Sequence, residues 1–229
     1  RMAAASFYCD GNRGAIYTFV QDPANIDNWI QEQKIVAPDA ASGDNFHIPE
    51  HGLNGNWLLA KSFSEGGSFY LYQFNGSEWT FVHKITSQLV GGVGIGGGAY
   101  LSEGFFIAGF TDPSIKIISF DETGWNLEQT LPFPGTVTGN PYFAWDIHAY
   151  SDGSRFAASC QLDNTFGPDA GSVYVYSLNS SGSWELSQHI EPPAGAPVRF
   201  GSYVRWHNDA LFVSHSLWDE APSTNAVYR

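Results

Sequence analysis

Apolar and polar positions alternate in short runs that recur along the chain. One kind of run opens at a small residue or turn former and then alternates, in residues 14–19, 67–72, 113–118 and 171–176. A further copy opens at Asn225. Alternation with a period of two predicts a β-strand with one buried face. Because the starts lie 46 to 58 residues apart, the pattern predicts a repeated β unit.

Each complete copy is followed by a second run that opens with a tryptophan. The tryptophan stands six residues before Ile or Leu in the pairs Trp29 and Ile35, Trp79 and Ile85, Trp125 and Leu131, and Trp184 and Ile190. Residues an even number apart share a face of a regular strand, so each pair is expected on one face. We predict that these tryptophans fill the core between sheets. The same role is expected for Tyr17, Tyr70, Tyr174 and Tyr228.

Hairpin turns precede each of these strand pairs. Asn54-Gly55 separates Leu53 from the apolar run 57–60, and Asn-Gly between apolar runs is a strong hairpin signal. Four strands in about 50 residues is the anatomy of a propeller blade. We therefore predict an all-β protein, a β-propeller of four-stranded antiparallel blades. Four to five blades of a seven-bladed ring are expected, in units 1–46, 47–95, 96–140, 141–198 and 199–229, with the first and last incomplete.

These recurring residues resemble the FG-GAP repeat family of β-propellers, which includes integrin-α-like and fungal-lectin-like domains. Residues 171–190, followed by 199–204, carry the resemblance most fully, and residues 29–46 carry it nearly as well. Only Phe200-Gly201 is a literal Phe-Gly pair. The calcium-binding loop of that family, Asp-x-Asp-x-Asp-Gly, is missing here, so the resemblance implies no metal site.

Composition excludes several classes of partner. Charged residues make up 14% of the chain and the net charge is −13, with lysine only at Lys34, Lys61, Lys84 and Lys116. A nucleic-acid-binding protein needs a basic face, which these residues cannot assemble. No run of 18 apolar residues is present to insert into a membrane. We expect neither nucleic acid nor a membrane as a partner.

The two cysteines are not expected to form a disulfide. Cys9 and Cys160 lie about three repeats apart, whereas a disulfide needs Cα atoms within roughly 7 Å.

The histidines are the first candidates for chemistry. His47 and His51 flank Glu50 at a spacing that would suit a metal on a helix, but Pro49 and Gly52 favour an exposed loop. We predict no zinc site there.

Two further segments contain candidate groups for chemistry. His215 lies near Trp218, Asp219 and Glu220, which could form a general acid/base group, although a blade loop explains them equally well. The glycine-rich segment 91–98 lacks lysine and is expected to be a connecting loop, not a phosphate cradle. No catalytic residue, metal ligand or cofactor is predicted.

Two sequons fall in the loops before repeat tryptophans. Asn75 and Asn179 would accept N-linked glycans in a secreted eukaryotic protein. Asn-Gly and Asn-Ser also favour turns, so both roles stay open.

The resemblance to adhesion-type propellers favours a non-enzymatic module outside the cell or on its surface, which would bind glycans or proteins through its loops. A second hypothesis is a building block of a surface assembly or filament, whose partners would be neighbouring subunits. A third is a propeller enzyme, a glycosidase or lyase, which would need paired carboxylates facing a pocket. The sequence shows no such pair, so we expect that the chain is not an enzyme.

Overall fold

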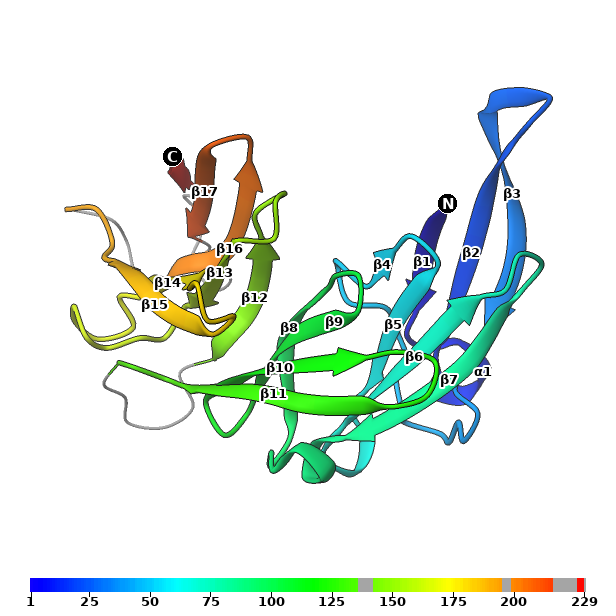
Figure 1. Cartoon of the computed structure of the whole chain (residues 1–229), viewed down its shortest axis with the longest axis horizontal. Helices are drawn as coiled ribbons and strands as arrows, with labels where there is room; N and C mark the ends of the chain where they lie inside the picture. Colours follow the sequence, from blue (N-terminus) through cyan, green and yellow to red (C-terminus); the bar gives the residue numbers. More distant parts are fainter. Residues whose placement is uncertain (136–141, 195–198, 216–225, 229) are drawn as a thin grey trace. The chain divides into compact units, whose positions relative to one another are not determined.

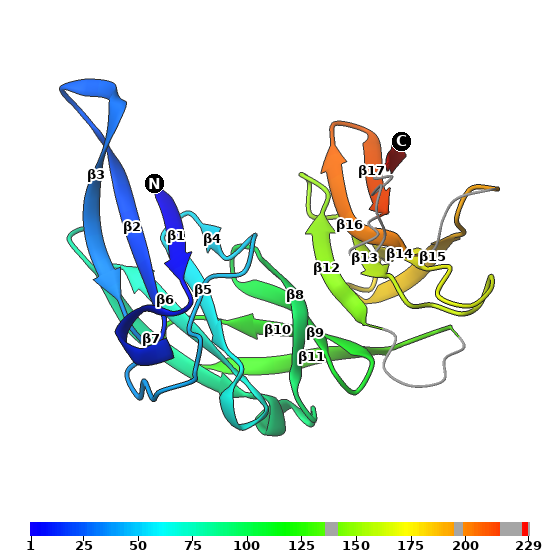
Figure 2. The same ribbon diagram turned by 180° about the vertical axis from the view of Figure 1, so that it is seen from behind.

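The computed structural model describes residues 1–135, 142–194, 199–215 and 226–228. Almost all regular structure in these residues is antiparallel β-sheet (Figures 1 and 2). The helical segments are short: α1 (Cys9–Asn12), η1 (Ser64–Gly66) and η2 (Ser87–Val90). The chain divides into two compact units, residues 1–95, 101–105 and 120–125 in the first and residues 96–100, 106–119 and 126–229 in the second. Each unit is described by itself.

Two sheets lie in the first unit. One has the order β1-β2-β3, and its strands are β1 (Met2–Ser6), β2 (Ala15–Asp22) and β3 (Asn25–Ile35). The other has the order β4-β5-β6-β7, and its strands are β4 (Leu53–Asn54), β5 (Trp57–Ser62), β6 (Ser68–Phe74) and β7 (Trp79–Thr86).

A third sheet has residues in both units, with the order β11-β10-β9-β8. Its strands are β8 (Ile95–Leu101), β9 (Phe105–Phe110), β10 (Ser114–Phe120) and β11 (Trp125–Pro132).

Two more sheets lie in the second unit. The first contains β12 (Phe143–Ala149), β13 (Arg155–Cys160), β14 (Ser172–Leu178) and β15 (Trp184–Ile190). The second contains β16 (Phe200–His207), β17 (Ala210–His215) and β18 (Ala226–Tyr228). The prediction of an all-β fold built from four-stranded antiparallel sheets is confirmed. The blade ranges and the seven-bladed ring stay predictions.

Three outer strands that carry a repeat tryptophan, β3, β7 and β15, contain a β-bulge at the same place. The pairing shifts by one residue between Thr18 and Phe19 of β2, between Leu71 and Tyr72 of β6, and between Val175 and Tyr176 of β14. The extra residues on the outer strands are Glu32, Val82 and Ser187. A bulge re-aims the side chains that follow it.

In these three strands the bulge overturns the expectation that the tryptophan shares a face with the aliphatic residue six positions later. Trp79 pairs with Phe74, while Ile85 pairs with Phe69. Phe69 and Phe74 are five positions apart on a regular strand and point to opposite faces, and paired residues share a face. Trp79 and Ile85 therefore point to opposite faces. The same displacement separates Trp29 from Ile35 and Trp184 from Ile190.

Because the tryptophan and the aliphatic residue of an outer strand point to opposite faces, that strand can contact two neighbouring sheets. In the first unit, Ile35 of β3 and Trp79 of β7 belong to one core cluster, together with Ile16, Phe46 and Tyr70. The indole N–H of Trp79 donates a hydrogen bond to the carboxylate of the bulged Glu32, at 3.2 Å. Ile35 thus packs toward the sheet β4–β7, and Trp79 packs toward the sheet β1–β3.

A glutamine in the outer strand holds the main chain of the next tryptophan. The amide nitrogen of Gln33 donates to the Trp79 carbonyl at 3.0 Å, and its oxygen accepts from the Trp79 N–H at 2.7 Å. Gln129 holds both main-chain groups of Trp184 in the same way, at 2.8 Å each. His83 stands at the equivalent position of β7, and its Nε2 lies 2.8 Å from the carbonyl of Asp121. We call the two-bond contact that Gln33 and Gln129 each make the glutamine clamp.

The repeat aromatic residues differ in burial. Trp79 and Trp184 are buried, Trp125 is half-buried and Trp29 is 42% exposed. The exposure of Trp29 departs from the expected core position: Trp79, on the same face of its strand, is buried by packing against the preceding sheet, whereas the face that carries Trp29 is open to solvent. Among the tyrosines, Tyr70 and Tyr174 are buried and Tyr17 is half-buried; the side chain of Tyr228 lies outside the described residues.

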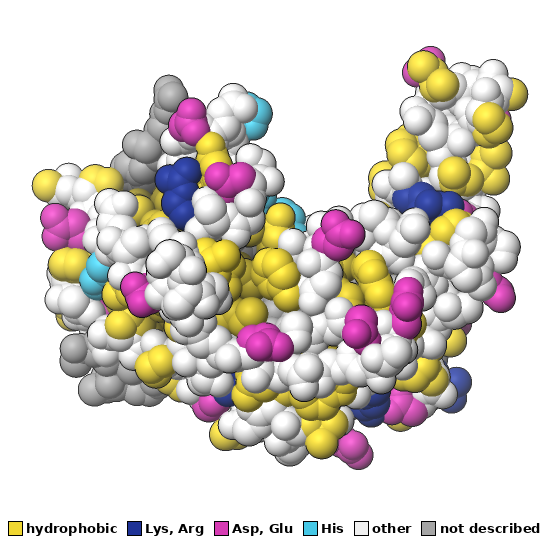
Figure 3. All heavy atoms as spheres, in the orientation of Figure 1, with side chains coloured by type: hydrophobic (Ala, Val, Ile, Leu, Met, Phe, Trp, Pro, Cys, Tyr) yellow, Lys and Arg dark blue, Asp and Glu magenta, His cyan; other side chains and the backbone are white. Residues whose placement is uncertain are grey.

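Surface properties vary over the chain. On the face drawn in Figure 3, acidic side chains are scattered and hydrophobic ones gather along the β2–β3 hairpin. The hairpin exposes Ile26, Trp29 and Ile30.

Within the described residues, no helix has the length and hydropathy needed to cross a membrane. Cys9 and Cys160 are not joined by a disulfide.

Candidate functional site

A buried lysine interrupts the repeat in the first unit. Lys61 is the fifth residue of β5 and is only 3% exposed. The fifth residues of the equivalent strands β9, β13 and β17 are small: Gly109, Ser159 and Ser214. Lysine is almost never fully buried without a specific partner. A position that is small in three sheets and cationic in one is therefore a candidate for function.

His47 lies directly across from Lys61. The two residues form an antiparallel bridge in which His47 N donates to Lys61 O at 2.9 Å and Lys61 N donates to His47 O at 2.8 Å. Directly paired residues present their side chains on the same face. His47 is 5% exposed. The bridge therefore places an imidazole and an amine side by side in a buried setting.

The orientation of the imidazole follows from its hydrogen bond. His47 Nδ1 lies 2.7 Å from the carbonyl oxygen of Asn45. A carbonyl can only accept, so Nδ1 carries the proton and Nε2 keeps its lone pair. His47 can therefore act as a base through Nε2.

Two aromatic rings flank the imidazole. Ring centroids lie 4.4 Å apart for Phe7 and His47, and 5.2 Å apart for Phe63 and His47. The Lys61 Nζ lies 5.1 Å from the Phe63 ring centroid, a distance that allows a cation–π contact. Phe7 is 41% exposed and Phe63 is 45% exposed, so these rings form the solvent-facing side of the cluster.

A buried carboxylate fixes the loop that carries His47. Asp44 accepts a hydrogen bond from the main chain of Ala41 at 2.6 Å and another from the Ser64 hydroxyl. The N–H of Phe63 donates to the Asp44 carbonyl at 3.2 Å. Asp44 therefore ties the loop before His47 to the segment after β5, which holds Phe63 against the imidazole.

Burial sets the charge of the pair. Desolvation lowers the pKa of Lys61 to about 8. Desolvation and the nearby charge of Lys61 together lower the pKa of His47 to about 4. At neutral pH the site therefore holds a neutral imidazole beside an ammonium group. In such a pair, the neutral base can activate water, and the cation can stabilise the negative charge that develops.

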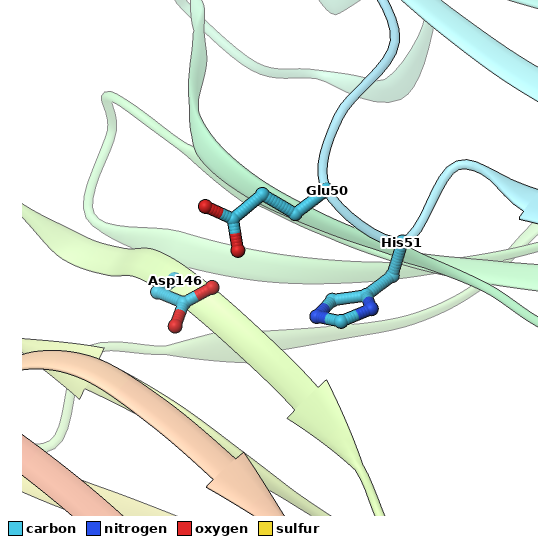
Figure 4. Close-up of side chains that lie close together, drawn as sticks. All are labelled: Glu50, His51 and Asp146. Atoms are coloured by element: carbon cyan, nitrogen blue, oxygen red, sulfur yellow. The ribbon is translucent and has the colours of Figure 1, made fainter. Parts of the chain in front are cut away.

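The structure does not join the two histidines of the predicted loop. His47 was expected in an exposed loop and is instead buried, because it pairs with β5. Glu50 and His51 lie on the loop before β4 (Figure 4). The His51 carbonyl accepts from the Leu101 N–H at 2.9 Å. Within either unit taken alone, the described residues hold no group of three His, Cys, Asp or Glu side chains at metal-ligand spacing.

A buried ion pair in the second unit has a structural role. Asp146 lies on β12 (Figure 4), and its Oδ2 accepts from Val204 N at 2.8 Å and from Arg205 Nη1 at 2.5 Å. Burial raises the pKa of Asp146 to about 6, while the guanidinium favours its ionised form. Nearby, His148 Nδ1 accepts from Trp206 N at 3.1 Å. These side chains join β12 to β16.

A second buried carboxylate organises the segment between β13 and β14. Asp163 is fully buried and accepts from Thr165 N at 2.9 Å, from the Tyr174 hydroxyl at 2.5 Å and from the Ser172 hydroxyl. Burial raises its pKa, but these hydrogen bonds outweigh burial and hold the pKa below the ordinary value.

The other candidates have structural explanations. His215 is buried in β17, while Trp218, Asp219 and Glu220 lie outside the described residues. The glycine segment 91–98 is not all loop, because β8 begins at Ile95. A Cβ on Gly97 would come within 2.6 Å of the Trp145 carbonyl, so β8 needs glycine to pack closely.

The sequon asparagines shape turns. The Asn75 side-chain oxygen accepts from Ser77 N and Glu78 N, both at 3.0 Å. Asn179 accepts in the same way from Ser181 N, and Asp121 plays this part in the equivalent loop with Thr123 N. Because an aspartate serves equally well, the turn explains these positions. Glycosylation of Asn75 and Asn179 stays a prediction.

Comparison with known proteins places the fold. No protein-family profile matches the chain, and no curated protein matches it. Among solved structures, the periplasmic gluconolactonase PpgL of Pseudomonas aeruginosa aligns with a TM-score of 0.61 at 14% identity, over 98% of this chain and 62% of that one. A Bacteroides uniformis protein assigned provisionally as a 6-phosphogluconolactonase aligns with a TM-score of 0.49 at 15% identity, over 92% of this chain and 63% of that one. The chain thus spans less than two thirds of either protein, and the fold is a β-propeller.

These findings correct two expectations. The resemblance to FG-GAP repeats is wrong, since no family profile supports it and the propeller that aligns over 98% of this chain with a TM-score of 0.61 is a gluconolactonase. Among the residues that carried it, the tryptophans and the glutamines four positions after them lie at contacts between sheets: Gln33 binds the main chain of Trp79, and Gln129 binds that of Trp184. These residues therefore indicate how the sheets pack together and do not identify a protein family. The prediction of a non-enzymatic binding module is also wrong, because the propeller that aligns over nearly the whole chain is an enzyme.

Proposed function

We propose that this chain is a propeller hydrolase that opens a lactone ring, with His47 as the base and Lys61 as the cation that stabilises negative charge. The observation that carries the proposal is the buried Lys61 beside the neutral His47, at a position that is small in three other sheets. The alignment with a gluconolactonase supports the choice of reaction.

The chemistry follows from the two side chains. His47 Nε2 removes a proton from water while the water oxygen bonds to the lactone carbonyl carbon. The Lys61 ammonium stabilises the oxyanion that forms. The carbonyl then re-forms as the ring carbon–oxygen bond breaks, and the ring alkoxide takes the proton from His47. The product is a hydroxy acid, and no oxidant or reductant is needed.

The aromatic rings suit a ring-shaped substrate. Phe7 and Phe63 flank the imidazole and are both partly exposed. The apolar face of a lactone ring can pack against a phenyl face. Phe7 lies in the short connection between β1 and α1. In this proposal its ring turns aside to admit the substrate.

The test is hydrolysis of gluconolactone, followed by acid release and corrected for the spontaneous rate. Lys61→Met and His47→Gln should each lower kcat/KM about a hundredfold or more. Lys116→Met is the matched control, because Lys116 is also 3% exposed but lies in another sheet, with Nζ 3.6 Å from Asp112. The control should keep wild-type activity. A folded Lys61→Met protein with wild-type activity would contradict the proposal.

A location outside the cytoplasm belongs to the same proposal. Its support is that the gluconolactonase of Pseudomonas aeruginosa is periplasmic. Fractionation of the native cells, with an antibody against this chain, should place it outside the cytoplasm. Recovery with the cytoplasmic markers would exclude that location.

A further inference from the structure

The lysines of the chain differ in the group that faces them. Three of them lie within ion-pair distance of an aspartate, in the pairs Lys34–Asp10, Lys84–Asp39 and Lys116–Asp112. A carboxylate beside an amine favours the protonated amine, which has no lone pair to attack a carbonyl carbon. Directly across from Lys61 stands His47, whose Nε2 can accept a proton. Lys61 is therefore placed beside a base.

The surroundings of Lys61 favour the neutral form of its amine. The residue is 3% exposed, and burial lowers the pKa of the amine to about 8. About a tenth of the amine is therefore neutral at pH 7. On β6 the residue paired with Lys61 is Phe69, which carries no charge. Desolvation in an apolar pocket is one of the ways in which a protein activates a lysine as a nucleophile.

In the proposed hydrolysis, the bound lactone presents its carbonyl group to both side chains. His47 activates the attacking water, and the Lys61 ammonium stabilises the carbonyl oxygen as it gains negative charge. When the amine of Lys61 is neutral, its nitrogen has a lone pair directed at the same carbonyl group. A lactone is a cyclic ester, which an amine opens to an amide just as water opens it to an acid. The amine therefore competes with water for the bound lactone.

We propose that Lys61 is a modification site, acylated by the lactones that bind beside it, an inference that rests on the proposed function. The amine nitrogen bonds to the lactone carbonyl carbon, and a proton passes from the nitrogen to His47 Nε2. The ring carbon–oxygen bond then breaks, and the ring alkoxide takes that proton from His47. The product is a hydroxyalkyl amide on Lys61, and no other reactant is needed. Because an amide carries no charge, each acylation removes the cation that hydrolysis requires.

The test is incubation of the folded protein with gluconolactone at pH about 8, the pKa of Lys61, followed by proteolysis and mass spectrometry of the peptides. Lys61 should gain the mass of one ring-opened lactone about tenfold faster than Lys34, Lys84 or Lys116. The rate of catalysed hydrolysis should fall in proportion to the acylated fraction. In protein unfolded by urea, all four lysines should react at similar rates, because the selectivity comes from the fold.

Two histidine variants test the proton transfer. His47→Gln should slow the acylation of Lys61 about tenfold or more, because the group that takes the proton is lost. His83→Gln is the matched control, because His83 lies on β7 and contacts the carbonyl of Asp121. It should leave the acylation of Lys61 unchanged.

The outcomes separate this proposal from the hydrolase proposal. Catalysed hydrolysis without a mass gain on Lys61, or with an equal gain on all four lysines, would overturn the acylation and leave the hydrolase standing. A selective gain on Lys61 without catalysed hydrolysis would support the acylation and overturn the hydrolase. The absence of both events would overturn both proposals.

Discussion

Two side chains in the first unit have pKa values well below their usual ones. Histidine normally gains a proton near pH 6.5, yet burial and Lys61 lower the pKa of His47 to about 4. Lysine is normally charged to above pH 10, yet burial lowers the pKa of Lys61 to about 8. Between these values the imidazole is a free base and the amine is a cation. That is the charge state which the proposed lactone hydrolysis requires.

The pH profile of hydrolysis tests this assignment. Activity should rise as pH increases through about 4, where His47 loses its proton, and fall above about 8, where Lys61 loses its charge. In Lys61→Arg the alkaline fall should disappear from the accessible range, because guanidinium stays charged. The measurement is kcat/KM against pH after subtraction of the spontaneous rate. An unchanged alkaline fall in Lys61→Arg would show that another group titrates there.

Asp163 should make the protein sensitive to acid. Its folded pKa lies below the unfolded one, so its stabilising effect is complete above the unfolded value of about 3.9 and is lost as pH falls through the folded value. Asp163→Asn should lower stability at pH 7 by about 1–3 kcal/mol. Thermal melting should show this gap between wild type and variant closing at low pH. A gap independent of pH would mean that the carboxylate charge contributes nothing.

At the scale of strands, the outer strand of each sheet joins packing to main-chain hydrogen bonding. The bulge at Glu32, Val82 or Ser187 separates the tryptophan from the following aliphatic residue and turns them to opposite faces. One strand can therefore contact the sheet before it and the sheet after it. The clamps at Gln33 and Gln129 then fix each pair of sheets in register.

The tryptophans should differ in their effect on stability according to burial. Trp79→Ala removes a buried side chain from the core and should cost about 3–5 kcal/mol. Trp29→Ala removes a side chain that is 42% exposed and should cost far less, within about 1 kcal/mol. Urea denaturation of both variants gives the comparison. Equal losses would contradict the difference in burial between the two tryptophans.

The glutamine clamp can be tested in one matched pair. Gln129→Ala leaves the main chain of Trp184 without its partner and should cost about 1–3 kcal/mol. Gln188→Ala alters an exposed glutamine at the equivalent position and should change stability by no more than about 0.5 kcal/mol. Denaturant midpoints report both. A costly Gln188→Ala would mean that Gln188 already holds a structural contact.

For the molecule as a whole, charge governs solution behaviour. The net charge is −13 at pH 7 and the sequence pI is about 4.7. Mutual repulsion keeps such chains apart, and it weakens as the charge approaches zero. Light scattering should therefore show aggregation near pH 4.7, where solubility is lowest, and no aggregation at pH 7. Activity on the acidic side of the profile should be measured at low protein concentration, so that association is not mistaken for titration of His47.

The sequence by itself determined the sheets. Alternation, turn residues and a tryptophan-led run are local properties, and local propensity suffices to predict antiparallel strands in a repeat. It did not determine faces, because a bulge inserted between Trp79 and Ile85 changes their relation without changing their spacing. The sequence did not determine the protein family either, because the residues that suggested one form contacts between sheets.

Only the tertiary structure decided the candidate site. His47 and Lys61 lie 14 positions apart and meet because the segment at His47 bridges to β5. The repeat did contain one signal, a lysine where Gly109, Ser159 and Ser214 stand in the equivalent strands. Sequence spacing cannot report burial, however, and burial is what lowers both pKa values. The strands follow from local preferences, whereas the chemistry depends on desolvation by residues distant along the chain.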